Sequence, residues 1–409
     1  VSRFSVSHGM LLNVLSRPSD GCQAMRQLIR DSHEPVAAKA AHVRRGWQLF
    51  RSLVTRDIIE VIPRTDAGTR VRVNVDLQAD FSMDQTLSLY LHETIPLLDP
   101  DSEDYALNLL TLVESILENP GAILRRQLDH LKGQAVAAMK AEGLDYDQRM
   151  AELDKLEHPK PQADFVYATF NAFADRHPWV GAENIRPKSI AREMFEGFRS
   201  FSDYVQDYGL ERVEGLLLRH LTSVYKVLRQ TVPDGMKSNA VVDIELYLRD
   251  MVRQVDSSLL EEWERMRDPG YQAPGLAEIE PEPSGQEPAP DITHDARRFT
   301  AAIRTQVFTF LRAWSFGTDE AALKVLDSGV DGFGAQWTPE RLTVARDAFR
   351  VEHRNLRLDP EARNLRHTHV HPSDDGTMWR VEQMLIDLEG LNDWVAELDI
   401  HLDASREAG

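Results

Sequence analysis

The chain lacks several features that would assign it to a common class of protein. It contains a single cysteine, Cys22, among 409 residues, so it cannot form an internal disulfide. No apolar run approaches the length of about 18 residues that a membrane-spanning helix requires. There is no G-x-x-x-x-G-K-[ST] phosphate-binding loop and no DExH or DEAD tetrad, so nothing cradles a nucleotide. We therefore expect a cytoplasmic protein with no membrane partner, no catalytic or metal-ligating residues, and no cofactor held in this chain.

What the chain does contain is a large excess of acid. It has 66 acidic and 47 basic side chains, a net charge of −19, and 42% hydrophobic residues, enough for folded cores. Such an acidic balance argues against a generic nucleic-acid binder. The charge is uneven, however: residues 1–75 carry twelve basic and six acidic side chains, a local charge of +6. The basic front is therefore a candidate nucleic-acid-binding region, whereas the acidic remainder is typical of a surface for protein partners.

A proline-rich and acidic stretch divides the chain. Residues 268–292 contain six prolines and six acidic side chains but no basic one. Proline prevents regular hydrogen bonding, and like charges keep such a segment extended. We expect an exposed linker there, with separately folded units on either side.

Residues 1–80 are predicted to combine helices with a hairpin. Asp20 is placed to cap one helix. The apolar face of the next helix is predicted to contain Val36, Ala40, Val43, Trp47 and Phe50. Apolar and polar residues then alternate over 70–77, which predicts a half-buried strand paired with 58–62 through a turn at Asp66-Ala67-Gly68. Helices followed by a two-stranded wing are the outline of a winged helix.

The rest of the chain is predicted to be mainly helical. Over residues 81–267, apolar side chains recur in steps of three and four, which indicates one-sided helices packed in a bundle. The last of these helices continues to Trp263. Residues 293–409 are predicted to begin with a long helix and a second one capped by Thr338, followed by three antiparallel strands. The overall expectation is a mainly α fold that ends in a small α+β domain.

Several stretches of the chain resemble known families. The segment SRFSVSHGMLLNVLSRP, Ser2–Pro18, is similar to the one after the last motor motif in DExH-box superfamily-two helicases, the RNA helicases that assist the exosome and their bacterial relatives. Gly209–Pro233 and Val252–Glu264 resemble a bacterial DEAD/DEAH-box helicase family with an uncharacterised C-terminal domain. In that family a winged helix and a helical bundle follow the motor. Residues 293–409 resemble the cone-shaped fold of nuclear transport factor two in element order alone.

The resemblance implies a role as the post-motor region of an ATP-dependent helicase. The motor itself is missing, so ATP and magnesium would belong to motor domains elsewhere on the same parent chain. The sequence opens at Val1 in mid-pattern, and we expect it to be a piece of a longer protein. The implied partners are single-stranded or duplex RNA or DNA, the motor domains, and a protein partner or second copy bound through 293–409.

Nine basic side chains are the candidate nucleic-acid contacts, because phosphate binding needs clustered positive charge. They are Arg44, Arg45, Arg51, Arg56, Arg70, Arg72, Arg212, Arg219 and Lys226. The last three are spaced by seven and could track a single strand, as the bundle of the helicase family does. Nearby Glu211 and Glu214 equally suit an ordinary salt-bridged face. The alternative for the whole chain is an acidic protein-interaction scaffold with no nucleic-acid role.

Two further patterns suggest a small-molecule site in the last domain. Alternating histidines on a strand can share a metal, and tryptophans can line the mouth of a pocket. The residues concerned are His367, His369 and His371, and Trp314, Trp337, Trp379 and Trp394. We expect ordinary strand histidines, because neither a cysteine nor an H-E-x-x-H pair accompanies them. We also expect core tryptophans, because Trp314 completes the apolar side of a helix and Trp394 the inner face of a strand.

Overall fold

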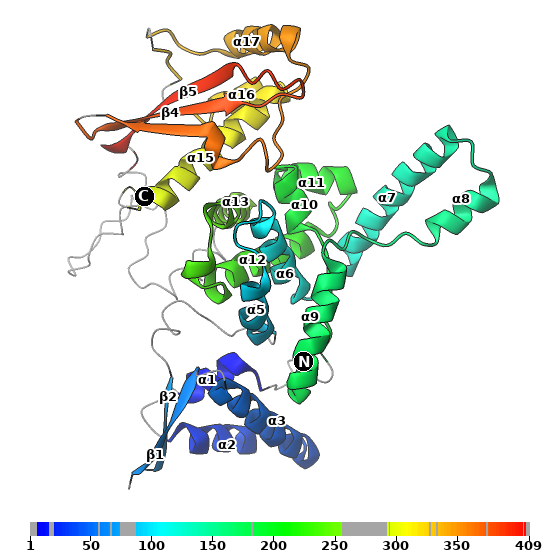
Figure 1. Ribbon diagram of the computed structural model, residues 1–409, viewed down its shortest axis with the longest axis vertical. Coiled ribbons are helices and arrows are strands. Elements are labelled where there is room, and N and C mark those ends of the chain that lie inside the picture. Colours follow the sequence, from blue (N-terminus) through cyan, green and yellow to red (C-terminus); the bar gives the residue numbers. More distant parts are fainter. Residues whose placement is uncertain are drawn as a thin grey trace. The chain divides into compact units, whose positions relative to one another are not determined.

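Helices make up most of the protein, as the sequence predicts, in a computed structural model that Figure 1 shows. The predicted linker 268–292 and the helix end near Trp263 lie outside the part that the structure describes. Within that part, no helix combines the length and the apolar character that crossing a bilayer demands. The described residues are 6–15, 20–55, 58–65, 68–73, 87–180, 183–255, 293, 295–326, 329–332, 334–373, 375–403 and 405.

The chain forms two compact units, each built from two stretches of sequence. Unit 1 contains 1–191 and 208–237, and unit 2 contains 192–207 and 238–409. The units divide the region 81–267, which is predicted as one bundle, because part of it groups with the C-terminal residues. The predicted domain borders themselves stay predictions.

The first part of unit 1 has three helices and a hairpin, in the predicted order. Asp20 caps the second helix as predicted, because its Oδ1 accepts the backbone N–H of Gln23 at 3.0 Å. The two strands pair antiparallel, with Val61 opposite Val71, which confirms the predicted pairing. Residues 66–67 of the predicted turn and 74–77 of the predicted strand lie outside the described residues. The assignment as a winged helix stays a prediction. The elements are α1 (His8–Leu15), α2 (Gly21–Asp31), α3 (Val36–Thr55), β1 (Ile59–Thr65) and β2 (Gly68–Val73).

The predicted apolar face of α3 is wrong in part. Val36 is 85% exposed and Trp47 is 43% exposed. The buried residues of the helix are instead Gly46, Leu49, Ser52 and Leu53. Two leucines bury more apolar area than the alanines of the first turns, so the C-terminal half decides which side of α3 packs. Trp47 is consequently left on the side that faces solvent.

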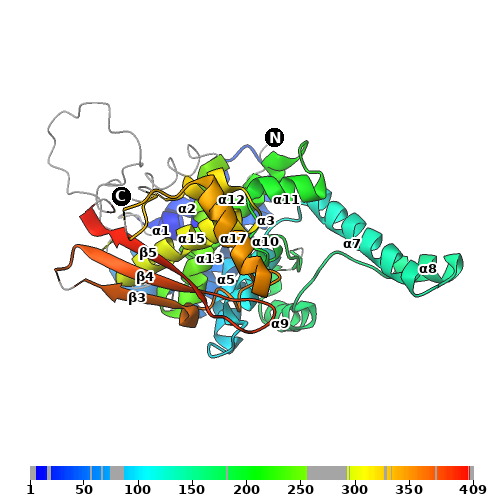
Figure 2. The same cartoon turned by 90° about the horizontal axis from the view of Figure 1, so that it is seen from above.

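The described residues of unit 1 form six more helices, and α6 lies at the centre of the unit. Leu109 and Leu110 of α6 are fully buried. In contrast, α7 buries only residues of its first two turns and α8 buries none, and both extend away from the other helices of the unit (Figures 1 and 2). The helices are α5 (Ser88–Thr94), α6 (Tyr105–Ser115), α7 (Gly121–Ala141), α8 (Tyr146–Leu153), α9 (Ala163–Arg176) and α12 (Glu214–Thr231), with the short 3₁₀ helices η1 (Ile95–Leu97), η2 (Pro178–Val180) and η3 (Asp234–Met236).

A buried carboxylate joins the helices at the centre of unit 1. Glu114 of α6 is fully buried, and its Oε1 accepts the backbone N–H groups of Ile190 at 3.0 Å and Ala191 at 2.9 Å. The Nε2 of His220 on α12 lies 3.0 Å from the same oxygen. Lys188 donates to the backbone carbonyl of Glu114 at 2.6 Å, and burial lowers the pKa of this lysine to about 8. Every polar group in this cluster is used to connect segments of the unit.

Unit 2 combines helices with a three-stranded sheet. Thr338 caps α17 as predicted, since its side chain accepts the backbone N–H of Arg341. The strands form an antiparallel meander in the order β3-β4-β5, with Val381 opposite both Val370 and Leu398. The three predicted strands are confirmed, whereas the likeness to nuclear transport factor two stays a prediction. The elements are α10 (Ala191–Glu196), α11 (Phe201–Tyr208), α13 (Asn239–Val255), α15 (Ala296–Ser315), α16 (Asp319–Leu323), α17 (Pro339–Glu352), η5 (Leu365–His367), β3 (Thr368–Pro372), β4 (Met378–Leu385) and β5 (Trp394–His401).

A buried arginine explains why 192–207 belongs to unit 2. The Cζ atom of Arg363 lies 4.1 Å from the ring centroid of Phe195 and 4.8 Å from that of Phe198. Its guanidinium also donates to the backbone carbonyl of Phe195. Tyr247 of α13 donates its hydroxyl to two backbone carbonyls of the same segment. Burial lowers the pKa of Arg363 to about 10, so the side chain remains charged at neutral pH.

Candidate functional site

Helix α3 has a positively charged side that faces solvent. Over its 20 residues the helix carries four basic side chains and no acidic one. Arg44 and Arg51 are exposed and lie seven residues apart, which is two helical turns, so they point to the same side. Trp47 lies between them on that side. We name Arg44, Trp47 and Arg51 the α3 outer face.

The surroundings of Trp47 add a further cation to this face. The Cζ atom of the exposed Arg26, on α2, lies 5.6 Å from the centroid of the Trp47 ring, within the range of a cation–π contact. Phe50 meets the ring edge-on, with centroids 5.6 Å apart. The contacts hold the indole at the surface while 43% of the residue remains exposed. Guanidinium groups beside a partly exposed ring suit both phosphates and bases.

Sequence reasoning missed Trp47 because it assigned this residue to the apolar face of α3. The signal that could have found it is the spacing of Gly46, Leu49 and Leu53, which defines an alternative buried side. Once that side is chosen, position 47 necessarily shares the opposite side with Arg44 and Arg51.

Arg45, also a predicted contact, is bound within unit 1. Its Nε donates to the backbone carbonyl of Val6 at 3.1 Å. Its Nη2 lies 3.5 Å from Oε1 of Glu183. The side chain therefore helps to attach α3 to the residues before α1 and after α9, and its charge is partly balanced there.

Two further predicted contacts lie on the hairpin. Arg70 and Arg72 lie on β2, where Arg72 is opposite Glu60 in the strand register. Arg56 lies outside the described residues.

The predicted basic stripe near α12 is mixed in character. Arg212 lies in the turn before the helix and Arg219 on the helix itself, and both are exposed. Lys226 is half-buried and already takes part in an interaction. The acidic Glu211 and Glu214 are exposed beside the first two positions, so both interpretations of the stripe stay open. The structure thus brings Arg44 and Arg51 together on one helix, while Arg219 belongs to another helix of the same unit.

The three alternating histidines do not form a site. His369 and His371 are exposed on β3, whereas His367 is half-buried in η5. Their ligating atoms do not converge on one point, although all three residues are described. The Nε2 of His371 instead lies 3.8 Å from Glu382 on the neighbouring strand. His369 and His371 thus lie on the strand as predicted, whereas His367 lies in the 3₁₀ turn before it.

Of the four tryptophans singled out in the sequence, Trp314 belongs to the core of unit 2, whereas Trp337, Trp379 and Trp394 are half-buried. Trp314 is 5% exposed, and its Nε1 donates to the carbonyl of Leu342 at 3.0 Å. Trp394 meets the ring of Phe349 edge-on, with centroids 5.5 Å apart. These contacts join α15, α17 and β5. Trp314 additionally reaches the wall of a cavity.

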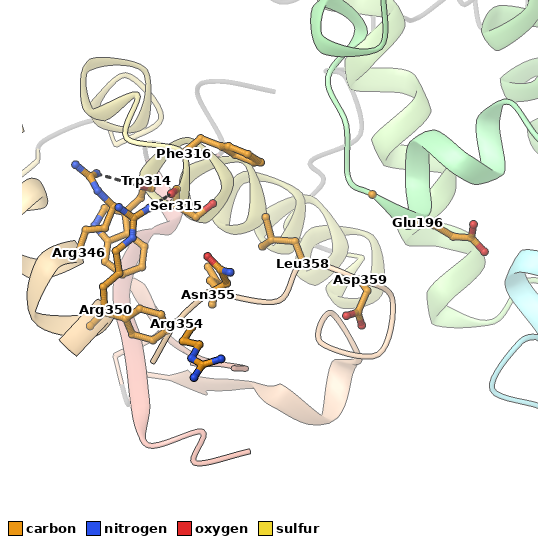
Figure 3. Close-up of a pocket in the computed structure, with 13 residues that line it drawn as sticks. Glu196, Trp314, Ser315, Phe316, Arg346, Arg350, Arg354, Asn355, Leu358 and Asp359 are labelled. Carbon is orange, nitrogen blue, oxygen red and sulfur yellow. Dashed lines mark hydrogen bonds between the residues drawn. The ribbon is translucent and has the colours of Figure 1, made fainter. Parts of the chain in front are cut away.

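This cavity, of about 430 Å³, lies beside α17 and is lined by three arginines (Figure 3). Arg346 is held by Asp319, with one Nη2–Oδ2 distance of 2.9 Å, and this pairing keeps the pKa of the Asp319 carboxyl below its usual range. Arg350 donates to the carbonyl of Ser315 at 2.9 Å. Arg346 also donates to the carbonyl of Trp314 at 3.0 Å, so two of the three guanidinium groups connect α17 to the end of α15, which indicates a mainly structural use. Arg354 is the third arginine that lines the cavity.

The comparisons with known proteins give one result. A family model described as a domain of unknown function, DUF3516, matches residues 1–409. No curated protein and no solved structure matches the chain. The chain therefore belongs, over its whole length, to the DUF3516 family.

Proposed function

We propose that the chain is the nucleic-acid-engaging region that accompanies the motor of an ATP-dependent helicase in the cytoplasm. The observation that carries the proposal is the α3 outer face, where Arg44 and Arg51 flank the partly exposed Trp47 on a helix without acidic residues. Helices α1–α3 and the following hairpin act as a winged helix in this proposal. The similarity of Ser2–Pro18 to the post-motor segment of DExH-box helicases supports the same assignment.

The chemistry of this face suits a nucleic-acid strand better than a protein. The Cα atoms of Arg44 and Arg51, two turns apart, are separated by about 10.5 Å along the helix axis, at 1.5 Å per residue. Such groups bind phosphates and release the counterions condensed on the strand. A partly exposed indole stacks on an unpaired base without regard to its identity. The combination favours single-stranded RNA or DNA, bound with little sequence preference.

The second candidate function is a protein-interaction scaffold without a nucleic-acid role. Its supporting observation lies in unit 2, where Val344 and Val351 of α17 are 69% and 82% exposed and seven residues apart. Exposed valines on one side of a helix favour an apolar partner, such as a second copy of the chain. The α3 outer face has no part in that function.

The test measures binding of fluorescently labelled single-stranded RNA and DNA over a salt titration. We expect the wild-type chain to bind at low salt and the double variant Arg44→Ala/Arg51→Ala to bind more than about tenfold more weakly. Loss of two phosphate contacts should lower the slope of log affinity against log salt by about 1.4, at 0.7 per contact.

A matched control separates this face from general electrostatic attraction. Arg125→Ala/Arg126→Ala removes the same charge from exposed positions on α7, in the same unit, and should leave the slope nearly unchanged. Equal losses in both double variants would assign the binding to net charge alone. Absence of binding by the folded wild-type chain at low salt would leave the scaffold as the better hypothesis.

A further inference from the structure

Three potential metal ligands converge at the end of α17. Glu352 is the last residue of the helix, His353 follows it, and Asp393 directly precedes β5. The ligating atoms of these side chains all lie within 4.8 Å of one another, the one such group among the described residues. The backbone brings the segments together, because the N–H of Arg357 donates to the carbonyl of Ile386 at 2.8 Å.

The imidazole of His353 is fixed by a buried carboxylate. Its Nδ1 lies 2.8 Å from Oδ2 of Asp387, and both side chains are fully buried. The Asp387 carboxylate also accepts the backbone N–H groups of Leu391 at 3.1 Å, of Asn392 at 2.9 Å and of Gly390. A carboxylate surrounded by donors in this way is an acceptor toward His353 as well, so we place the ring proton on Nδ1. A carboxylate that orients a histidine in this way is the usual second partner of a metal-binding imidazole.

The other ring nitrogen has no hydrogen-bond partner among the described residues. Nε2 of His353 is buried and unsatisfied, although Oδ1 of Asp393 lies only 3.1 Å away. With the proton on Nδ1, Nε2 presents a lone pair to a carboxylate oxygen, and two such groups repel each other. A cation bound by both Nε2 of His353 and Oδ1 of Asp393 removes the repulsion. Such a cation also explains why the buried Nε2 has no hydrogen-bond donor beside it.

We propose that His353, Asp393 and Glu352 bind a divalent transition-metal ion, with Nε2 as the nitrogen ligand and Asp387 as its orienting partner. One imidazole and two carboxylates suit Zn²⁺ or Mn²⁺. Glu352 and Asp393 are exposed, so water or a ligand can occupy a further coordination position. The bound ion connects the end of α17 to the turn that leads into β5.

The surrounding charge favours a cation. The turn between β4 and β5 contributes the carboxylates of Asp387 and Asp393, and Glu352 adds a third. Nearby Arg354 lies 3.9 Å from Glu389, at the limit of an ion pair. The site does not depend on the proposed nucleic-acid function, since it lies in unit 2 and shares no residue with the α3 outer face.

The experiment uses the full chain, freed of any histidine tag and stripped with a chelator. Zn²⁺ and Mn²⁺ are titrated separately by calorimetry, and Co²⁺ absorption reports on nitrogen and oxygen coordination. We expect saturable uptake of a single ion per chain. Asp393→Asn and Glu352→Gln change exposed side chains, so they should fold normally and weaken binding by more than tenfold. Asp387→Asn should weaken binding about 10–100-fold through loss of the oriented imidazole.

Glu389→Gln is the matched control, because it removes a carboxylate from the same turn without touching the cluster. It should bind the ion as the wild-type chain does. The proposal is overturned if the folded wild-type chain takes up no ion, if binding survives in both Asp393→Asn and Glu352→Gln, or if Glu389→Gln weakens it equally.

Discussion

Arginines serve opposite purposes in the α3 outer face and in the interior of unit 2. Arg44 and Arg51 are exposed on a helix without acidic residues. Arg304, Arg346 and Arg363 are at most 7% exposed, and each donates to backbone carbonyls or to a carboxylate. The same side chain is therefore a candidate binding group in one region and a structural connector in the other.

The difference teaches that charge has to be considered together with burial. Residues 293–409 contain thirteen arginines but a single lysine. A guanidinium presents five N–H donors in a planar fork, so it can bond several carbonyls at once, which an ammonium group does less well. The preference for arginine over lysine suits this structural use. It also explains why a count of basic residues alone would overstate the capacity of unit 2 to bind nucleic acid.

Among the arginines compared, removal of the buried Arg363 should cause the largest loss of stability. We expect Arg363→Ala to lower the free energy of unfolding by about 3 kcal/mol. The variant loses the guanidinium contacts with the rings of Phe195 and Phe198, and it leaves buried carbonyls without donors. Arg363→Lys should recover less than half of this loss, since the ammonium group lacks the fork. Urea titration followed by tryptophan fluorescence measures both. A loss below about 1 kcal/mol for the alanine variant would contradict the connector role.

The pairing of Arg346 with Asp319 should give a smaller effect that depends on pH. The pairing lowers the pKa of Asp319, so its contribution is present above the unfolded value, about 3.9, and disappears as pH falls through the lower folded value. At pH 7, Asp319→Asn should be about 1–3 kcal/mol less stable than the wild-type chain. Unfolding titrations between pH 7 and pH 2 should show the two proteins converging in acid. A constant difference across this range would mean that the ionised carboxylate is not responsible.

We expect the smallest loss of stability when an arginine of the α3 outer face is replaced. Arg44→Ala and Arg51→Ala should each change the free energy of unfolding by less than about 0.5 kcal/mol, because exposed side chains lose little on truncation. The same urea titration measures this. A loss comparable to that of Arg363→Ala would place these arginines among the structural ones and would remove the contrast between the regions.

Much of the local structure could be predicted from the sequence. The caps at Asp20 and Thr338, the hairpin of β1 and β2, and the three strands at the C-terminus are all found where predicted. These features depend on residues close together in the chain, such as a side-chain oxygen three residues before the N–H that it accepts. Short-range chemistry of this kind is present in the sequence itself.

The candidate sites depended on more distant contacts. Trp47 could belong to either side of α3 until Leu49 and Leu53 are known to be buried. Arg45 lies next to Arg44 in sequence, yet it bonds Val6 and Glu183 while its neighbour is exposed. The pairing of His353 with Asp387 joins residues 34 positions apart, for which no spacing rule exists.

The sequence by itself determined the mainly helical class, the element order and the uneven charge, because these follow from residue type and local periodicity. Only the tertiary structure decided that 192–207 joins the C-terminal residues around Arg363, and which arginines of the chain remain exposed. The physical reason is that burial is a property of the assembled core. A guanidinium has the same charge in every sequence, but its use is set by the carbonyls, rings and carboxylates that folding brings beside it.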